Sequence, residues 1–323
     1  MLVSVLLFAV GLVLLIKGGD WFVDGATGLA RRFRLPDIIV GATVVSIGTT
    51  LPEVMVSVTG ALAGQGAMAY GNAIGSIICN TSLIAAISVA CNPGPVNTKT
   101  MKMPVIFFFV SAAVYCVAAY VLGEFPRWLG FVLLGIFVIY MFITVRQGLK
   151  NPEAAHEEED EGEKKEKPLW QELLLLVIGA AVIAVGADLL VDHGTIIAKE
   201  LGVPETVIAL TFVALGTSLP ELVTTITSLK KGHASLGIGN VIGANIFNLV
   251  LVSGASVALA PFTVPVGNMI FGINSSLVLD IPLMVTVMLL LTIPALASKK
   301  LGRWQGITLL CIYAAFCVLQ FVM

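Results

Sequence analysis

Charged residues are scarce in this chain of 323 residues, and their scarcity argues against a soluble protein. Asp, Glu, Lys and Arg together make up 12% of the sequence, whereas about 25% is usual in soluble domains. The two signs nearly balance, with a formal net charge of -2, so there is no basic excess to attract nucleic acid. We therefore expect neither a soluble core nor a nucleic-acid partner.

Side chains for catalysis and for transition metals are also sparse. The five cysteines lie within or at the end of apolar runs and lack the spacing of a metal site, which predicts neither disulfides nor zinc. The three histidines are scattered, and no nucleophile and base pair is evident. The glycine-rich segments contain no Gly-x-Gly-x-x-Gly nucleotide motif. The sequence thus predicts no enzyme and no bound cofactor.

Hydrophobic residues, at 58% of the sequence, gather in long runs. Most runs exceed the roughly 20 residues that a helix needs to cross a bilayer. The first run lacks a basic leader and a clear cleavage site, so we treat it as a helix of the mature protein. We predict an all-α membrane protein, embedded in the lipid bilayer, with ten transmembrane helices near residues 2–30, 38–62, 67–91, 104–122, 128–147, 170–198, 206–229, 235–260, 272–297 and 304–322.

The two halves of the chain are copies of each other. A shift of 168 positions aligns Gly-Thr-Thr-Leu-Pro-Glu at 48–53 with Gly-Thr-Ser-Leu-Pro-Glu at 216–221 without a gap. Between 48–83 and 216–251, fourteen of thirty-six residues are identical, which indicates a duplication. Each half holds five crossings, an odd number, so the second copy is inverted in the membrane. We expect a first five-helix repeat at 1–150, a linker at 151–168 and a second, inverted repeat at 169–323.

The distribution of basic residues predicts the orientation. If the N-terminus lies outside, fifteen of the eighteen lysines and arginines fall in inside-facing segments, as the positive-inside rule requires. Both termini would then be outside and the acidic linker, which we expect to be solvated and disordered, would be cytoplasmic. We expect the protein to lie in the inner (plasma) membrane of a prokaryote.

A glutamate occupies the same position in both copies of the motif. Glu53 and Glu221 lie midway along apolar helices, where an ionisable group costs at least about 2.5 to 3.5 kcal/mol unless it faces a cavity or a partner. Each follows a proline, which removes a helical hydrogen bond and frees a backbone carbonyl one turn earlier. The alternative is that each proline is a packing kink whose glutamate forms a buried hydrogen bond.

Hydroxyl groups surround these glutamates and complete a set of hard oxygen ligands. Such ligands suit calcium, whose double charge two carboxylates would neutralise, and sodium can use the same groups. The pattern therefore predicts a cation site. The hydroxyl residues of the two motifs are Thr49, Thr50, Thr217 and Ser218.

The following helix of each copy carries two asparagines eight residues apart with a small residue midway between them, and this spacing of four places all three on one helical face. We favour Asn80 and Asn248 as ligands or site-lining residues, with hydrogen bonding between helices as the alternative. The glycines of this segment are expected to serve close helix packing. The residues of the shared faces are Asn72, Ser76 and Asn80 in the first copy, and Asn240, Ala244 and Asn248 in the second.

With the paired Gly-Thr-[Thr/Ser]-Leu-Pro-Glu and Gly-Asn-x-x-Gly-x-x-x-x-Asn motifs, the sequence resembles the calcium/cation antiporter superfamily, especially the prokaryotic sodium/calcium exchangers. Essentially the whole chain fits. The resemblance implies a site in the middle of the membrane between the second, third, seventh and eighth helices. It also implies alternating access through movement of the first and sixth helices.

The resemblance also implies the ligands. Calcium and sodium would bind Glu53 and Glu221, with Asn80 facing them. Two positions depart from some relatives, because Asn248 replaces an aspartate and Ala244 replaces a serine. Loss of the aspartate argues against a potassium-dependent exchanger. Further side-chain ligands map to Thr49, Thr50, Ser76, Thr217 and Ser218, and backbone carbonyl ligands to Ser46 and Ala214.

These observations favour a sodium/calcium antiporter in which the two ions compete for the same glutamates. A proton/calcium antiporter, or one for another divalent cation, is the alternative, because empty glutamates inside the membrane can take up protons. A cation channel is less favoured, because inverted repeats around a central site are typical of alternating access. The oligomeric state is left open by the sequence.

Overall fold

The computed structural model describes residues 2–150, 167–201, 216–266, 269–270 and 272–322. Nearly all of these residues are helical, and the strands are two-residue pairs in loops. In the first half the elements are α1 (Leu2–Arg32), α2 (Asp37–Val40), the π-helical η1 (Gly41–Val45), α3 (Ser46–Leu62), α4 (Gly66–Cys79), π-helical η2 (Asn80–Ala85), α5 (Ala86–Cys91), β1 (Gly94–Pro95), α6 (Thr98–Val117), π-helical η3 (Ala118–Leu122), β2 (Glu124–Phe125) and α7 (Arg127–Lys150).

The second half follows the same order of long helices as far as it is described. Its elements are α9 (Leu169–Glu200), α12 (Leu219–Lys230), α13 (Ala234–Phe247), π-helical η5 (Asn248–Val252), α14 (Ser253–Leu259), β3 (Phe262–Thr263), β4 (Met269–Ile270), β5 (Ile273–Asn274), π-helical η6 (Ser276–Asp280), α15 (Ile281–Ser298), β6 (Lys300–Leu301) and α16 (Arg303–Val322).

Eight helices within the described residues are long and apolar enough to cross a membrane, so this is a helical integral membrane protein. They agree with eight of the predicted runs to within six residues at each end. The largest difference is at α6, which begins at Thr98 because the side chain of Asn97 caps its first turn. Of the other two predicted runs, 304–322 corresponds to α16, and 206–229 corresponds to α12 only in part, because 202–215 lie outside the described residues.

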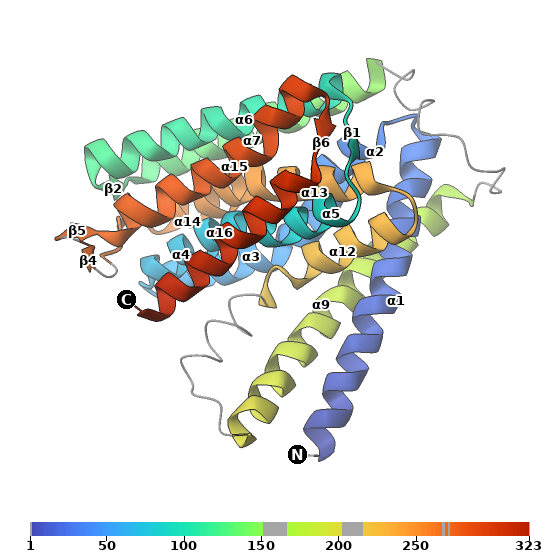
Figure 1. The fold of residues 1–323 in the computed structure, drawn as a ribbon, viewed down its shortest axis with the longest axis horizontal. Helices are drawn as coiled ribbons and strands as arrows, with labels where there is room; N and C mark the ends of the chain where they lie inside the picture. The colour runs from blue at the N-terminus through green and yellow to red at the C-terminus, as the bar shows by residue number, and fades with distance from the viewer. Residues whose placement is uncertain (1, 151–166, 202–215, 267–268, 271, 323) are drawn as a thin grey trace.

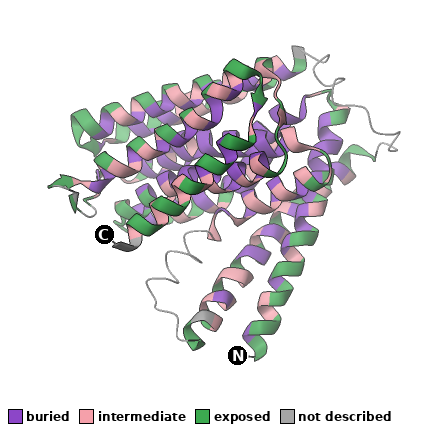
Figure 2. Cartoon of the chain, in the orientation of Figure 1, coloured by how far each residue is buried: buried purple, intermediate pink, exposed green. Residues whose placement is uncertain are grey.

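Two continuous spans form the centre of the bundle. In the most apolar windows of α4–η2–α5 and α13–η5–α14, 72% and 89% of the residues are buried, against 28% in α1 and 22% in α9. Figure 2 shows this contrast between the buried interior and the exposed outer helices. A helix that is apolar on all sides belongs in such a centre, and both spans contain the asparagines that the sequence places on one face.

The long helices α1 and α9 pack against each other and extend beyond the rest of the bundle (Figure 1). They run antiparallel, since Gly11 lies against Gly186 while Gly18 lies against Gly179. A Cβ added to Gly11 would be 2.9 Å from the backbone oxygen of Gly186, and one added to Gly186 would be 2.9 Å from that of Gly11. Small residues let the backbones approach closely, which is how helices associate in lipid.

Short strand pairs join loops at the two ends of the bundle. β1 pairs with β6, which brings the loop before α6 to the loop before α16. β2 pairs with β3, which brings the loop before α7 to the loop after α14. The β1–β6 pair and the β2–β3 pair thus each hold together two loops that are far apart in the sequence.

The close α1–α9 contact leads to a stability prediction at Gly25. A Cβ there would lie 2.6 Å from the backbone nitrogen of Leu176 and 2.7 Å from the backbone oxygen of Glu172. Gly25→Ala should destabilise the fold by about 1 to 3 kcal/mol through overpacking, which would appear as a lower melting temperature in detergent.

The matched control is Gly135→Ala in α7, where no described atom lies within 4 Å of the added Cβ. That variant should melt at or above the wild-type temperature, because alanine favours the helix. Equal melting temperatures for the two variants would show that the α1–α9 contact is looser than described.

Candidate cation site

The two copies of the proline motif adopt different local structures. In the first copy, α3 continues through Pro52 and is preceded by the π-helical η1. In the second copy the chain turns at Thr217 and Ser218, and α12 starts with Pro220 in its first turn, a position that proline tolerates well. The helix is therefore interrupted just before the proline in the second copy. In the first copy the irregular backbone is the π-helical segment that ends at Val45, before the motif begins.

Both motif glutamates are completely buried. Glu53 on α3 and Glu221 on α12 each have 0% exposure, and no described group forms a hydrogen bond with any of their four carboxyl oxygens. This result does not support the alternative of a hydrogen-bonded kink at Glu53, whereas the hydroxyl groups of Thr49 and Thr50 lie within reach of the carboxyl group of Glu221. Unpartnered charges at this depth are strongly unfavourable unless a cation or protons neutralise them.

The carboxyl groups approach each other across the contact between α3 and α12. Glu53 and Glu221 are close enough for direct electrostatic repulsion, and Thr49 and Thr50 lie beside the carboxyl group of Glu221. Because neither acid has a basic partner among the described residues, the arrangement suits a positive ion bound between them.

Asn80 and Asn248, which the sequence predicts as ligands or site-lining residues, lie on the two central spans. Each is the first residue of a π-helical segment, η2 or η5, and such segments are frequent at functional sites. Asn248 donates from Nδ2 to the backbone oxygen of Ala244 at 3.0 Å, and its buried Oδ1 has no described partner. The side chain of Asn80 is likewise buried without a described partner.

The hydroxyl residues differ in their surroundings. Thr50 and Ser218 are buried, with Thr50 beside the carboxyl group of Glu221 and Ser218 beside the thiol of Cys79. Ser46 Oγ lies 2.8 Å from the backbone oxygen of Gly41 and 2.9 Å from that of Asn240. Ser76 is buried on α4. The predicted carbonyl ligand at Ala214 lies outside the described residues.

The two remaining threonines make matching contacts with the neighbouring central helices. Thr49 Oγ1 donates to Asn240 Oδ1 at 3.2 Å, and Thr217 Oγ1 donates to Asn72 Oδ1 at 3.2 Å. The sequence shows that Asn72 and Asn240 share a face with the other asparagines, but it did not predict these pairings. A signal was available in the 168-residue offset, because it aligns Thr49 with Thr217 and also Asn72 with Asn240.

Sequence reasoning also missed Cys79. Its fully buried thiol lies beside Ser218 and Glu221, although the motif spacing assigned it no role. No cluster of three or more His, Cys, Asp or Glu occurs in the described part of the chain. The site therefore has two acids surrounded mainly by neutral oxygens, which is not a ligand set for zinc.

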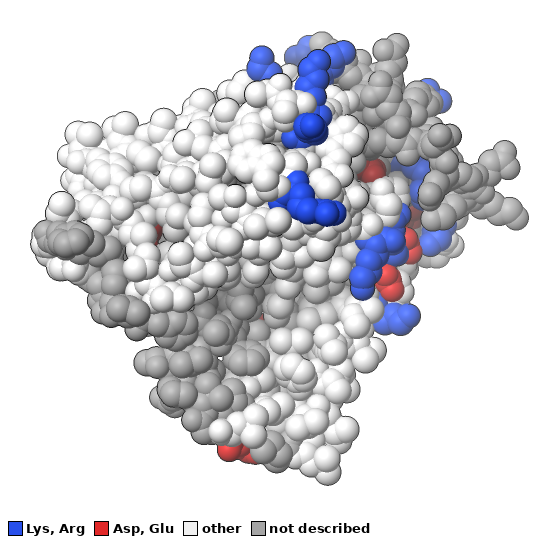
Figure 3. Space-filling model, in the orientation of Figure 1, with Lys and Arg blue, Asp and Glu red and all other residues white. Residues whose placement is uncertain are grey.

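A group of ion pairs lies at one end of the bundle, away from the motif glutamates. Lys231 binds Asp24 at 2.9 Å and also contacts Asp20, and Arg32 binds Glu172 at 3.1 Å. Asp20 and Asp24 thus have a lysine as their partner. Figure 3 shows basic side chains gathered at that end, while the rest of the visible face is almost uncharged.

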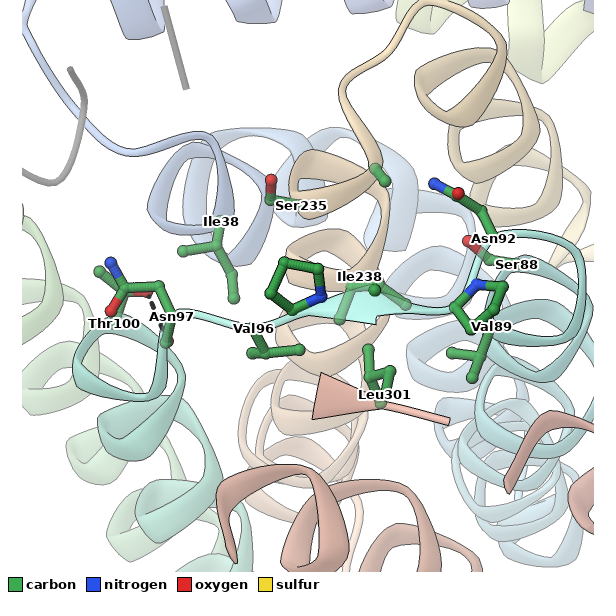
Figure 4. A pocket seen from close by; sticks show the side chains of 14 residues that line it. Ile38, Ser88, Val89, Asn92, Val96, Asn97, Thr100, Ser235, Ile238 and Leu301 are labelled. Atoms are coloured by element: carbon green, nitrogen blue, oxygen red, sulfur yellow. Dashed lines mark hydrogen bonds between the residues drawn. The ribbon is translucent and has the colours of Figure 1, made fainter. Parts of the chain in front are cut away.

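A pocket in the loop region between α5 and α6 is shown in Figure 4. Its lining includes Asn92, Asn97, Thr100 and Ser235, together with apolar side chains, and none of its lining residues is charged. None of the predicted cation ligands lines it. The carboxylate site is therefore a separate, more deeply buried feature of the structure.

Comparison with known proteins identifies the family of the chain. The profile of the family described as sodium/calcium exchanger protein matches residues 3–146 and 172–322, which together include most of the sequence. The chain belongs to this family. It is thus a transporter of a cation-exchanging family, and the match falls in two segments that correspond to the two halves of the chain.

Individual relatives extend over nearly the same length. The sodium/calcium exchanger MaX1 of Methanosarcina acetivorans is 30% identical, covering 99% of both chains, and the inner membrane protein YrbG of Escherichia coli is 35% identical, covering 81% of both. A solved structure of the sodium-calcium exchanger NCX_Mj, soaked with 2.5 mM Na+ and 10 mM Sr2+, has a TM-score of 0.80 at 32% identity and covers 97% of each chain.

The unpartnered carboxyl oxygens lead to a binding prediction. Calcium should raise the melting temperature of the purified protein, since a ligand at 100 times its Kd stabilises the folded state by about 2.7 kcal/mol. In Glu53→Gln and Glu221→Gln, the calcium-induced shift should be nearly absent, because one charged ligand has been removed.

Glu172→Gln is the matched control, because Glu172 is also buried but binds Arg32 instead of facing the site. It should lower the melting temperature without calcium and retain the calcium-induced shift. A full calcium shift in both motif variants would exclude these glutamates as ligands.

Proposed function

We propose that this protein exchanges calcium for sodium across the membrane and that Glu53 and Glu221 hold the transported cation. The observation that carries the proposal is the pair of fully buried carboxyl groups, which approach each other with no hydrogen-bond partner among the described residues. Two carboxylates neutralise one calcium ion, and the surrounding neutral oxygens can fill its remaining coordination positions. The site takes up ions as cargo, without a resident cofactor.

The ligand set in this proposal joins both halves of the chain. Glu53 and Glu221 supply charge, while Asn80 and Asn248 supply amide oxygens from the starts of matching π-helical segments. Asn248 is neutral where the resemblance implies an aspartate, so only two acids bind the ion. The remaining proposed ligands are Thr49, Thr50, Ser76, Thr217 and Ser218 through their side chains, and Ser46 and Ala214 through their backbone carbonyls.

We infer that the ten-helix chain consists of two inverted five-helix repeats, at 1–150 and 169–323. Contacts that exchange under the 168-residue offset support this inference. The contact of Gly11 with Gly186 becomes that of Gly179 with Gly18, and the Thr49–Asn240 contact corresponds to that of Thr217 with Asn72. An approximate two-fold axis in the membrane plane would relate such pairs.

The proposed orientation has both termini outside and the 151–168 linker in the cytoplasm of a prokaryote. The strand pairs support this orientation, because each pair joins two loops that it places on the same side of the membrane. β1 and β6 join two loops that the topology places inside, next to Lys99 and Lys299, whereas β2 and β3 join two loops that it places outside. The end rich in basic residues in Figure 3 would be the cytoplasmic end.

In this proposal, α1 and α9 move against the central bundle and expose the site to each side in turn. Of the spanning helices, these two are among the least buried, and they are paired through glycines rather than interlocking large side chains. An empty site would leave two carboxylates repelling each other, so ion loading would favour the rearrangement. Calcium and sodium would compete, because both need the same two glutamates.

A proton/calcium antiporter is the second candidate, because protons can also neutralise buried, unpartnered carboxylates. Sodium coupling is favoured by the family match and by the sodium/calcium exchangers among the relatives. The neutral oxygens around the acids also provide coordination that sodium uses and a proton does not.

The test is calcium uptake into proteoliposomes, measured with a radioactive tracer. Vesicles loaded with sodium and diluted into sodium-free medium should accumulate calcium, whereas a pH gradient alone, without sodium, should drive little uptake. Glu53→Gln and Glu221→Gln should reduce sodium-driven uptake at least a hundredfold, because loss of one charge unbalances the site.

Glu172→Gln, reconstituted at the same protein density, should retain sodium-driven uptake and serves as the control for replacing a buried acid. Uptake that follows the pH gradient and ignores sodium would replace sodium with protons as the coupled ion. Undiminished uptake in both motif variants would overturn the site.

A further inference from the structure

The hydrogen bonds between motif threonines and central asparagines bear on how the site is prepared for a cation. Each threonine hydroxyl points its hydrogen at an asparagine Oδ1 of a helix from the opposite half, at 3.2 Å in both cases. Thr49 pairs with Asn240, and Thr217 pairs with Asn72. One interaction thus occurs twice, with the roles of the halves exchanged.

The direction of the hydrogen bond is fixed at Asn72. Its Nδ2 donates to the backbone oxygen of Glu53 at 3.1 Å and to Ser57 Oγ at 2.8 Å. A backbone oxygen only accepts, so the amide nitrogen must face Glu53 and the amide oxygen must face Thr217. The hydroxyl of Thr217 therefore has to be the donor.

This direction matters because a hydroxyl binds a cation through its lone pairs. A hydrogen pointing at the ion would oppose binding, whereas an acceptor on the far side holds the hydrogen away and leaves the lone pairs free. We propose that Asn72 and Asn240 are positioning residues that orient the hydroxyls of Thr217 and Thr49 toward the transported cation. The inference rests on the proposed function, in which these threonines are ligands.

The same contacts link the helices that carry the ligands. Asn72 on α4 touches the backbone of Glu53 on α3 and the side chain of Thr217 before α12. Asn240 on α13 receives the hydrogen of Thr49, and Ser46 Oγ lies 3.3 Å from the same Oδ1. Each asparagine thus connects a hydroxyl of one half with a central helix of the other.

A set of variants at 72 and 217 tests the inference in sodium-loaded proteoliposomes. Asn72→Ala should raise the calcium concentration for half-maximal uptake about five- to tenfold, the loss expected for one hydrogen bond. The same substitution should have a similar effect in Thr217→Ser, which keeps the hydroxyl. In Thr217→Val, which lacks the hydroxyl, Asn72→Ala should change the calcium concentration for half-maximal uptake less than twofold.

Asn245→Ala is the matched control. Asn245 is also fully buried on α13 and also pairs with a threonine, donating to Thr81 Oγ1 at 2.7 Å, but neither residue belongs to the proposed ligand set. Its removal should lower the melting temperature and leave half-maximal calcium within about twofold of wild type, because the ligand hydroxyls keep their acceptors.

An equal loss from Asn72→Ala in the valine and serine backgrounds would overturn the inference, because the asparagine would then act without the hydroxyl. If Asn72→Ala does not fold, Asn240→Ala in Thr49→Val and Thr49→Ser gives the same comparison with the same two outcomes. Wild-type uptake under the sodium gradient is measured alongside, so failure of exchange itself, which would remove the proposed function, is distinguished from failure of the positioning role.

Discussion

The repulsion between two buried carboxyl groups is the interaction on which the rest of this structure depends. Glu53 and Glu221 are inside a membrane protein, approach each other, and have no described hydrogen-bond partner. Desolvation and mutual repulsion both disfavour the doubly charged state without a cation. In the proposed function, such a site is stable only when it is loaded, and this requirement couples the entry of one ion to the exit of another.

Among the described residues, no basic side chain forms an ion pair with either glutamate, and hydroxyl groups lie beside Glu221. The ion pairs of Lys231 with Asp24 and of Arg32 with Glu172 lie at one end of the bundle, where each acid has a basic partner. Proline and π-helical segments supply irregular backbone in the interior, and the two central spans supply amides. In the proposed site, the two copies of the motif supply one glutamate each, so that neither half is complete alone.

Much of this arrangement follows from the sequence. Eight spans agree with apolar runs, and Glu53 and Glu221 stood out because a charge in the bilayer is costly. The different backbone conformations at the two prolines did not follow, because nearly identical motifs give no signal that one helix continues through Pro52 while another begins at Leu219, with Pro220 in its first turn. The contact of Cys79 with Ser218 was also not predicted, because a cysteine within an apolar run indicates only a packed side chain.

The asparagine pairings show what single-sequence reasoning lacks. Spacing places Asn72 on the same helical face as Asn80, but a hydrogen bond with Thr217 depends on how α4 meets the other half of the chain. Helix periodicity determines which side of a helix a residue occupies, whereas crossing geometry determines its partner. The repeat offset narrows the choice, because any contact between halves should occur twice.

The most direct measurement of the central claim is anomalous X-ray diffraction from crystals soaked with Sr2+, a calcium analogue that can be located by its own scattering. The account predicts one strong peak between α3 and α12, within coordination distance of the carboxyl groups of both Glu53 and Glu221. Strontium bound only elsewhere, for example at Asp20 and Asp24, with the two glutamates left without an ion under saturating conditions, would contradict it.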